Sequence, residues 1–249
     1  MKIFLRGLLV LFSIGLLWQG LVTFFYLPPY ILPAPLEVIY TTYLHANLIF
    51  HELLITIMET LIGLFLGTLL GCSAAFVMVF FKPFRLWLFP ILIISQAIPT
   101  FAIAPLLVIW FGYGIASKIA TTIIMVFFPI TSAFFDGLRS TSPEWIDLAK
   151  TMNAKKWRFF WYIRIPAALP SLASGLRVAT AVAPIGAVIG EWVGASQGLG
   201  FLMLNANARM QIDLMFSGLF ALVLFSLLFY FLVDTLLRLL IPWQRMDAS

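Results

Sequence analysis

Long apolar runs recur along this chain from one end to the other, and each approaches the roughly 20 residues that an α-helix needs to cross a bilayer. Of 249 residues, 63% are hydrophobic and 10% are charged, whereas soluble domains have roughly 45–50% apolar and 25% charged residues. The sequence therefore predicts an all-α membrane protein with a single transmembrane domain over residues 1–249. We expect six transmembrane helices, at about 7–27, 54–81, 86–111, 115–135, 168–190 and 214–241.

The first apolar run follows Lys2 and Arg6, as it would in a secretory signal peptide. It continues through Phe25 without a small-residue cleavage site, so we interpret it as an uncleaved first span.

The basic residues predict how the spans are oriented. If the N-terminus is cytoplasmic, 12 of the 15 Lys and Arg residues fall in inner segments, Lys118 and Arg209 fall in outer segments, and Arg177 lies inside the fifth span. Cytoplasmic loops of membrane proteins are enriched in Lys and Arg. We therefore expect both termini on the cytoplasmic side, and we attribute the net charge of +5 to topology and not to nucleic-acid binding.

The interval 137–166 is the only long polar segment, and it has the signals of a helix start. Ser142 is a candidate N-cap, Pro143 suits the first helical position, and Glu144 places an acid in the first turn. Apolar residues then recur near helical spacing, with basic residues between them. This pattern predicts an amphipathic helix or helix pair that ends at Pro166, where the chain re-enters the membrane.

Two general explanations fit this loop: a basic amphipathic helix on anionic lipid headgroups, or a solvated loop that fixes topology. A third comes from a residue pattern that resembles the EAA motif of ABC importer permeases, E-A-A-x3-G-x9-I-x-L-P. The matching positions are Asp147, Leu148, Ala149, Asn153, Ile163 and Pro166. The spacing agrees, but Asp replaces Glu, Leu replaces Ala, Asn replaces Gly, and Ile165 replaces Leu. Asn, like Gly, tolerates a left-handed backbone.

The resemblance extends over nearly the whole chain. Segments such as Leu32-Pro33-Ala34-Pro35, Ile98 to Leu106 and Gly190-Glu191-Trp192 are similar to the nitrate/sulfonate/taurine branch of these permeases, and the stretch from Ala183 to Met210 most resembles permeases for thiamine-precursor pyrimidines. The resemblance implies the type I importer fold, coupling helices at 143–160 that dock on an ABC ATPase dimer, a second copy of the permease and an extracytoplasmic binding protein. It also implies a bacterial inner membrane location.

The chain has no motif that would let it hydrolyse ATP. It contains no Gly-Lys pair, and so no phosphate-binding P-loop, and no H-E-x-x-H or C-x-x-C metal motif. We therefore expect no cofactor or metal in this chain, and no enzymatic activity. The resemblance assigns ATP and Mg²⁺ to the partner ATPase.

Ionisable residues in apolar spans are costly and suggest function. They are Glu59, Arg177, Glu191 and Asp234. Arg177 either pairs with one of the acids or contacts the solute. Glu191, followed by Trp192 at the outer end of the fifth span, is our first candidate for an external gate, and Glu59 and Arg177 are further candidates for the path.

Prolines and glycines inside the spans give further predictions. Pro99, Pro105 and Pro184 either break helices that line a path or only kink them. Glycines also recur every four residues, at Gly63, Gly67 and Gly71 and at Gly186, Gly190 and Gly194. Such stripes favour close helix packing, within the chain, at a sliding surface or in a homodimer.

Two other classes of function remain as alternatives. An ion-gradient-driven secondary transporter or channel would need inverted repeats or paired membrane carboxylates, and no convincing repeat is present. An intramembrane enzyme would need a nucleophile with a base or a metal-ligand set, and the spans contain neither.

Overall fold

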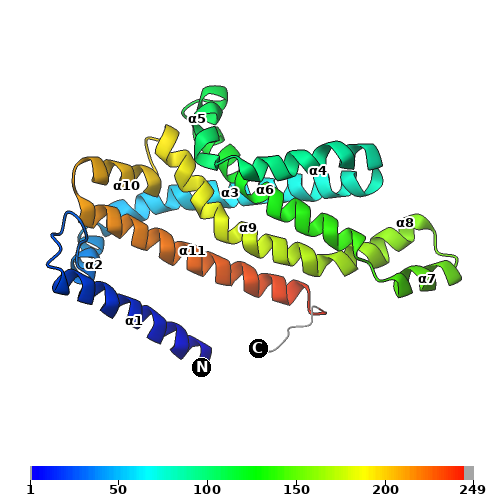
Figure 1. Ribbon diagram of the computed structural model, residues 1–249, viewed down its shortest axis with the longest axis horizontal. Helices are drawn as coiled ribbons and strands as arrows, with labels where there is room; N and C mark the ends of the chain where they lie inside the picture. The colour runs from blue at the N-terminus through cyan, green and yellow to red at the C-terminus, as the bar shows by residue number, and fades with distance from the viewer. Residues whose placement is uncertain (1, 244–249) are drawn as a thin grey trace.

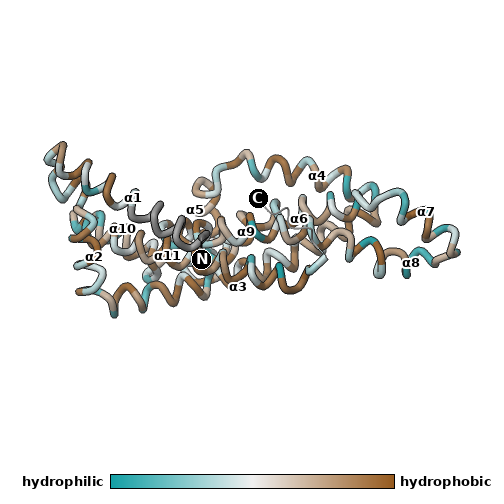
Figure 2. Tube along the Cα trace, turned by 90° about the horizontal axis from the view of Figure 1, so that it is seen from below, coloured by the Kyte–Doolittle hydropathy of each residue, from teal (hydrophilic) through white to brown (hydrophobic). Residues whose placement is uncertain are grey.

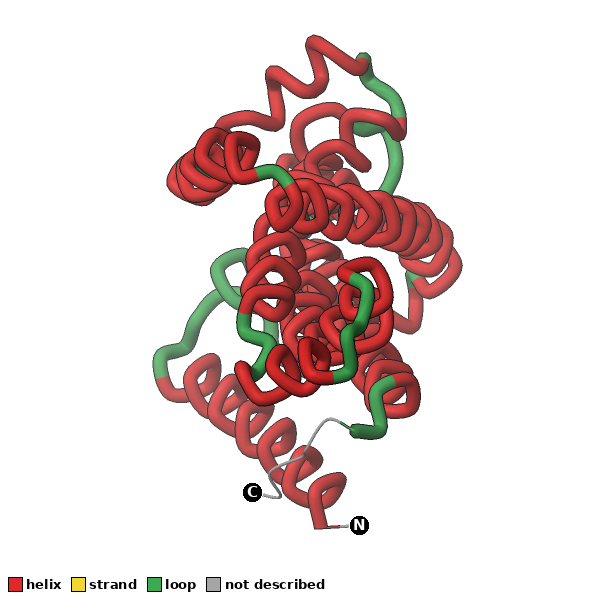
Figure 3. Tube along the Cα trace, turned by 90° about the vertical axis from the view of Figure 1, so that its right-hand side faces the viewer, coloured by secondary structure: helices red, strands yellow, loops and turns green. Residues whose placement is uncertain are grey.

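The computed structural model describes residues 2–243, with side chains from Ser13 onward, and this range contains helices and no strands (Figure 1; Figure 3). Four long apolar helices run along the molecule: α3 (Ala46–Phe80), α6 (Ile115–Arg139), α9 (Ile165–Gly194) and α11 (Ile212–Leu240). At 1.5 Å per residue, even the 25 residues of α6 extend roughly 38 Å, which exceeds the roughly 30 Å hydrocarbon core. These helices confirm the predicted all-α membrane fold.

Within the described range, four helices could cross a membrane by length and composition, or five if the bent pair α4–α5 is counted as one span, and the remaining helices are shorter. The first predicted span falls on α1 (Lys2–Phe24), and the third falls on α4 (Lys82–Ala97) and α5 (Thr100–Phe111). Short helices α2 (Pro35–Leu44) and α10 (Leu199–Ala208) lie at one end of the molecule, and α7 (Pro143–Thr151) and α8 (Lys156–Phe159) lie at the other (Figure 1). Of the residues counted for orientation, Lys2, Arg6 and Arg245 lie outside the described side chains.

The third span, expected as one helix over 86–111, is broken. The axes of α4 and α5 differ by 107°, and the break falls at Ile98 and Pro99. Ile98 is extended, with φ −88° and ψ 121°, because a proline disfavours helical geometry in the residue before it. Pro105 and Pro184, which we also considered as breaks, lie inside α5 and α9.

We predicted that the helix leading into the fifth span ends at Pro166. This prediction was wrong. Pro166 is the second residue of α9, and the helical path runs unbroken from Lys156 to Gly194. The π-helical turn η1 (Phe160–Arg164) directly precedes it, and Ile165 donates its N–H to the Phe160 carbonyl. A proline ring clashes with the carbonyl four residues earlier in a regular α-helix, and the wider π-turn relieves that clash.

Both glycine stripes mediate helix packing within the chain. A Cβ added to Gly63 or Gly67 of α3 would lie 2.5 or 2.2 Å from side-chain atoms of Thr122 or Val126 on α6. Cβ atoms at Gly186 and Gly190 of α9 would lie 2.8 Å from backbone atoms of α6. The helix α6 therefore packs closely against both α3 and α9, at separations that leave no room for a Cβ at these glycines.

Figure 2 shows hydrophobic residues along the long helices and more hydrophilic residues at α7 and α8. One buried cluster, around Phe134, Phe135 and Phe160, lies near the α7–α8 end. A second, around Leu199, Leu202 and Leu214, lies near the α10 end. The bundle is thus packed at both ends, and the polar α7–α8 segment projects beyond it.

Candidate functional site

The first candidate site is the projecting segment of α7 and α8, at residues 143–159. Helix α7 begins as expected, with Ser142 at the N-cap and Pro143 in the first position, although the Ser142 side chain makes no capping hydrogen bond. Trp145, Leu148 and Trp157 are 54%, 50% and 65% exposed. Large apolar side chains gathered on a polar, projecting segment are typical of a protein-binding surface.

The turn between α7 and α8 depends on Asn153. Its φ is +50°, in the left-handed region. Asn153 donates its N–H to the Lys150 carbonyl, and Ala154 donates its N–H to the Ala149 carbonyl. These two bonds form a Schellman motif, in which the left-handed position usually holds Gly. Asn153 thus has the left-handed geometry that Asn, like Gly, tolerates.

The other motif positions differ in exposure. Asp147 is exposed and pairs with Lys150 at 2.9 Å, a surface contact that contributes little to stability. Ala149 is buried. Ile163 lies in η1, and Pro166, at the start of α9, accepts a 3.3 Å hydrogen bond from the indole of Trp243.

The projecting segment is firmly attached to the bundle at its α8 end. Phe160 is 5% exposed and packs on Phe76 and Phe80 of α3, with ring centroids 5.9 and 4.6 Å away. Arg164 donates a hydrogen bond from Nε to the Leu138 carbonyl of α6. No role for Arg164 was predicted from the residue pattern. A force on α7 or α8 would thus reach α3, α6 and α9.

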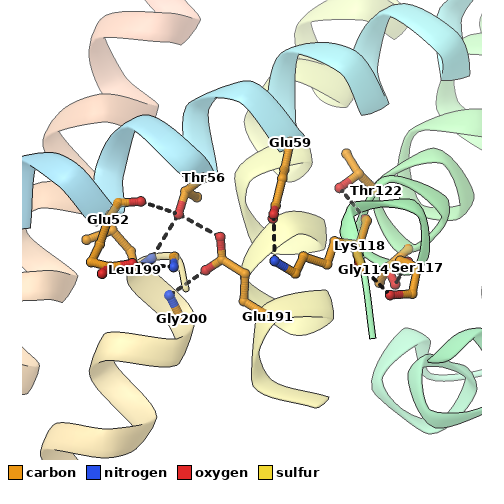
Figure 4. Close-up of polar contacts among 12 residues, drawn as sticks. Glu52, Thr56, Glu59, Gly114, Ser117, Lys118, Thr122, Glu191, Leu199 and Gly200 are labelled. Atoms are coloured by element: carbon orange, nitrogen blue, oxygen red, sulfur yellow. Dashed lines mark hydrogen bonds and ion pairs between the residues drawn. The ribbon is translucent and has the colours of Figure 1, made fainter. Parts of the chain in front are cut away.

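The second candidate site is a buried polar cluster nearer the α10 end (Figure 4). The Glu191 carboxylate, on α9, accepts hydrogen bonds from the Thr56 hydroxyl at 2.7 Å and from the Gly200 N–H. The Thr56 hydroxyl in turn accepts the Leu199 N–H at 2.9 Å, and Glu52 accepts the Gly198 N–H. Glu191 therefore fastens the turn before α10 to both α9 and α3.

One helical turn beyond Thr56, Glu59 forms an ion pair with Lys118 of α6, with Nζ 2.8 Å from Oε1 (Figure 4). We had counted Lys118 with the outer connecting segments, and this was wrong, because Lys118 lies in the first turn of α6 and is 6% exposed. A lone lysine at the start of an apolar span was the signal for this pairing. Both charges are buried, so each requires the other.

The remaining candidate residues lie apart from this cluster. Arg177 pairs with Asp234 of α11, with Nε 2.6 Å from Oδ1, and Asp234 also pairs with Arg238. This confirms that Arg177 pairs with a membrane acid. Trp192 is 51% exposed, on a different face of α9 from Glu191. Pro99 stands at the break between α4 and α5.

Comparisons of the sequence with known proteins identify its family. The family described as "Binding-protein-dependent transport system inner membrane component" matches residues 67–246. The chain is 51% identical to a "Probable ABC transporter permease protein" of Haemophilus influenzae, over 94% of this chain and 96% of that protein. It is 38% identical to a formylaminopyrimidine transport permease protein of Halalkalibacterium halodurans, over 87% of each.

More distant relatives carry other substrate names. A taurine transport system permease protein of Escherichia coli is 28% identical, over 91% of this chain and 85% of that protein. Further relatives, 34% and 28% identical, are named for riboflavin and aliphatic sulfonate transport.

One solved structure confirms the fold. The crystal structure of an amino acid ABC transporter with histidines matches with a TM-score of 0.62, at 18% identity, over 82% of this chain and 97% of that chain. The chain therefore belongs to the family of binding-protein-dependent inner membrane transport components, and it is a multi-pass permease subunit of an ABC importer of the sulfonate/taurine branch, a transport subunit and not an enzyme.

Proposed function

We propose that two copies of this chain form the membrane path of an importer that is driven by a dimer of ABC ATPase subunits and supplied by an external binding protein. ATP and Mg²⁺ bind to the ATPase and not to this chain. The observation that carries the proposal is the α7–α8 segment, which projects from the bundle with Trp145, Leu148 and Trp157 exposed. We assign this surface to contact with the ATPase.

The attachment of α8 supports a mechanism of alternating access. Closure of the ATPase dimer moves α7 and α8, and the packing of Phe160 on α3 and the bond from Arg164 to α6 transmit that movement. Because α8, η1 and α9 form one helical path, α9 moves with them. At the opposite end α9 carries Glu191, and its movement there opens or closes the path.

The proposed orientation places both termini, α7 and α8 in the cytoplasm, and α2 and α10 on the outer side. The α7–α8 segment contains Lys150, Lys155, Lys156 and Arg158, as expected for a cytoplasmic segment. The burial of Lys118 removes it from the outer connecting segments. Arg209 is then the basic residue left on the outer side.

We propose that the solute is a small polar molecule, most specifically a thiamine-precursor pyrimidine. The support is the 38% identity to a formylaminopyrimidine permease, compared with 28% to the taurine permease. Sulfonate, taurine and nitrate are the competing substrates.

Substitution of an exposed apolar residue on α7 tests the assignment of the ATPase-binding surface. Leu148→Asp should abolish co-purification of the ATPase and ATP-dependent uptake. Leu148 is half exposed, so the permease itself should still fold and reach the membrane. Leu44→Asp is a matched control, because Leu44 is 64% exposed on α2 at the opposite end. Retention of the ATPase by Leu148→Asp would overturn the assignment.

The energy source is tested separately in proteoliposomes that contain the permease and the ATPase. Uptake should require ATP and should be insensitive to ionophores. Uptake driven by an ion gradient without ATP would favour the secondary-transporter alternative.

A further inference from the structure

A cavity of about 240 Å³ lies beside the break between α4 and α5. Four elements line it: the end of α4, the start of α5, and the middles of α6 and α9. Its lining residues include Ser95, Gln96, Thr100, Met125, Phe128 and Val182. In Figure 1, α5 turns away from α4 above the crossing of α6 and α9.

The cavity lies near the centre of the membrane-spanning region. Met125 and Phe128 are close to the midpoint of α6 (Ile115–Arg139), and Val182 is close to the midpoint of α9 (Ile165–Gly194). Non-helical backbone at this depth is tolerated only where it is buried in protein or lines a polar cavity. The extended Ile98, together with Pro99, is such backbone, and Ile98 lines the cavity.

Gln96 supplies an amide without a partner. Among the described residues, no hydrogen bond involves its side chain, which is exposed on the cavity side of α4. Polar side chains in membrane-spanning segments are costly unless they meet a hydrogen-bonding partner, and they usually face a cavity or the bundle interior. A solute that passes through the cavity is such a partner.

The break adds a backbone donor. Thr100, which lines the cavity, is the first residue of α5, so its N–H has no intrahelical carbonyl to bond, whereas Ala102 bonds to the Pro99 carbonyl. With Gln96, Ser95 and Thr100, the site offers both donors and acceptors around apolar walls of Met125 and Phe128.

The size and charge of the cavity select among solutes. None of its lining residues is ionisable, and an anion in a low-dielectric site without a cation is strongly disfavoured. Pockets for drug-sized ligands measure roughly 300–1,000 Å³, so a volume of about 240 Å³ suits a single ring.

We infer that this cavity is a solute-binding station within the membrane, which takes a neutral, single-ring, hydrogen-bonding heteroaromatic solute, with Gln96 as its specificity-determining residue. The inference rests on the proposed permease function. It adds a second point of selection after the external binding protein.

The test uses the complete transporter, with its ATPase and binding protein, in proteoliposomes. The probes are formylaminopyrimidine, taurine, an alkanesulfonate and riboflavin, each supplied above saturation of the binding protein. Wild type should transport formylaminopyrimidine alone. Gln96→Leu removes the amide at similar size and should reduce that uptake about tenfold, which is the loss expected for about one hydrogen bond. Gln96→Asn should restore part of the uptake.

Gln19→Leu is the matched control, because Gln19 lies in α1, away from the cavity, and bonds to Thr23. It should transport like wild type. Unchanged uptake by Gln96→Leu would overturn the role of the cavity, and efficient uptake of the sulfonate or of riboflavin would overturn the solute class. ATP-dependent turnover measured in parallel separates these results from a failure of the permease function itself, in which no variant would couple ATP hydrolysis to uptake.

Discussion

Glu59 of α3 and Lys118 of α6 form an ion pair across the interior of the bundle, with Oε1 and Nζ 2.8 Å apart and side chains 1% and 8% exposed. The second oxygen of Glu59 is buried without a hydrogen-bond donor among the described residues. Lys118 is therefore the main compensation for this buried charge. The pair lies one helical turn from Thr56, which binds Glu191, so it also fixes the part of α3 that holds the outer turn.

Removal of one partner should destabilise the protein more than removal of both. Lys118→Met leaves the Glu59 charge buried and uncompensated, a loss of about 3–5 kcal/mol. In the double variant Glu59→Gln with Lys118→Met neither charge of the pair remains, so much of this loss should be recovered. Thermal unfolding of the detergent-solubilised permease–ATPase complex would measure the order. Equal melting temperatures for the single and double variants would show that Lys118 does not compensate the buried charge of Glu59.

Substitutions at Gly198 and Gly112 test whether the turn before α10 is tightly packed. Gly198 lies in that turn, and Gly112 serves as the control. Both have positive φ, +109° and +80°, but a Cβ at Gly198 would lie within 2.3 Å of the Glu191 carboxylate, whereas a Cβ at Gly112 would meet nothing within 4 Å. Each alanine substitution adds backbone strain of roughly 1–2 kcal/mol. Gly198→Ala should in addition break the Glu191 contacts and lower both uptake and melting temperature. Similar behaviour of the two variants would argue against a packed outer turn.

The turn at Asn153 predicts opposite effects of two substitutions. Gly has no steric penalty at φ +50°, so Asn153→Gly should retain or improve coupling between ATP hydrolysis and uptake. Asn153→Val places a β-branched residue in the left-handed region and should destabilise the turn by roughly 1–2 kcal/mol or more. The ratio of solute transported to ATP hydrolysed is the measurement. Normal coupling in Asn153→Val would show that the Schellman geometry is dispensable.

Glu191→Gln tests the proposed external gate. A glutamine keeps the size of the side chain, but the Thr56 hydroxyl and the Gly200 N–H donate to different oxygens of the carboxylate, and glutamine replaces one of these acceptors with an NH2 donor. Uptake should fall several-fold at normal expression. Glu37→Gln, an exposed change on α2 at the same end, should have little effect. Wild-type uptake by Glu191→Gln would remove this residue from the gate.

The proposed orientation can be checked by labelling single cysteines. The chain has one cysteine, Cys72, so a Cys72→Ser background leaves only an introduced thiol. In intact cells a membrane-impermeant maleimide should label Asn207→Cys on α10 and should label Thr151→Cys on α7 only after the membrane is opened. Both positions are exposed. The reverse pattern would invert the topology.

Local signals in the sequence were sufficient for much of the fold. Apolar runs predicted the four long helices α3, α6, α9 and α11, because the bilayer requires apolar side chains over a fixed length. Ser142, Pro143 and Glu144 predicted the start of α7, and Asn153 tolerates the left-handed turn that the structure has there, because capping and backbone preferences act within a few residues.

Other features were decided by which helices lie side by side. Pro99 breaks its span whereas Pro105 and Pro184 stay within helices, because the cost of a proline depends on what neighbouring groups can satisfy. Arg177 had several membrane acids as possible partners and pairs with Asp234, 57 residues away. Lys118, which was counted with the outer segments, is buried against Glu59.

The sequence by itself thus determined where the long apolar helices lie along the chain and where its projecting helix begins. Only the tertiary structure decided that α6 packs against two glycine stripes, that Glu191 fastens the outer turn, and that a cavity opens beside Gln96. The physical reason is the distance along the chain over which each interaction acts. Helix formation and membrane insertion depend on residues that are neighbours in the sequence. Buried charge pairs and cavities depend on groups that only packing brings together.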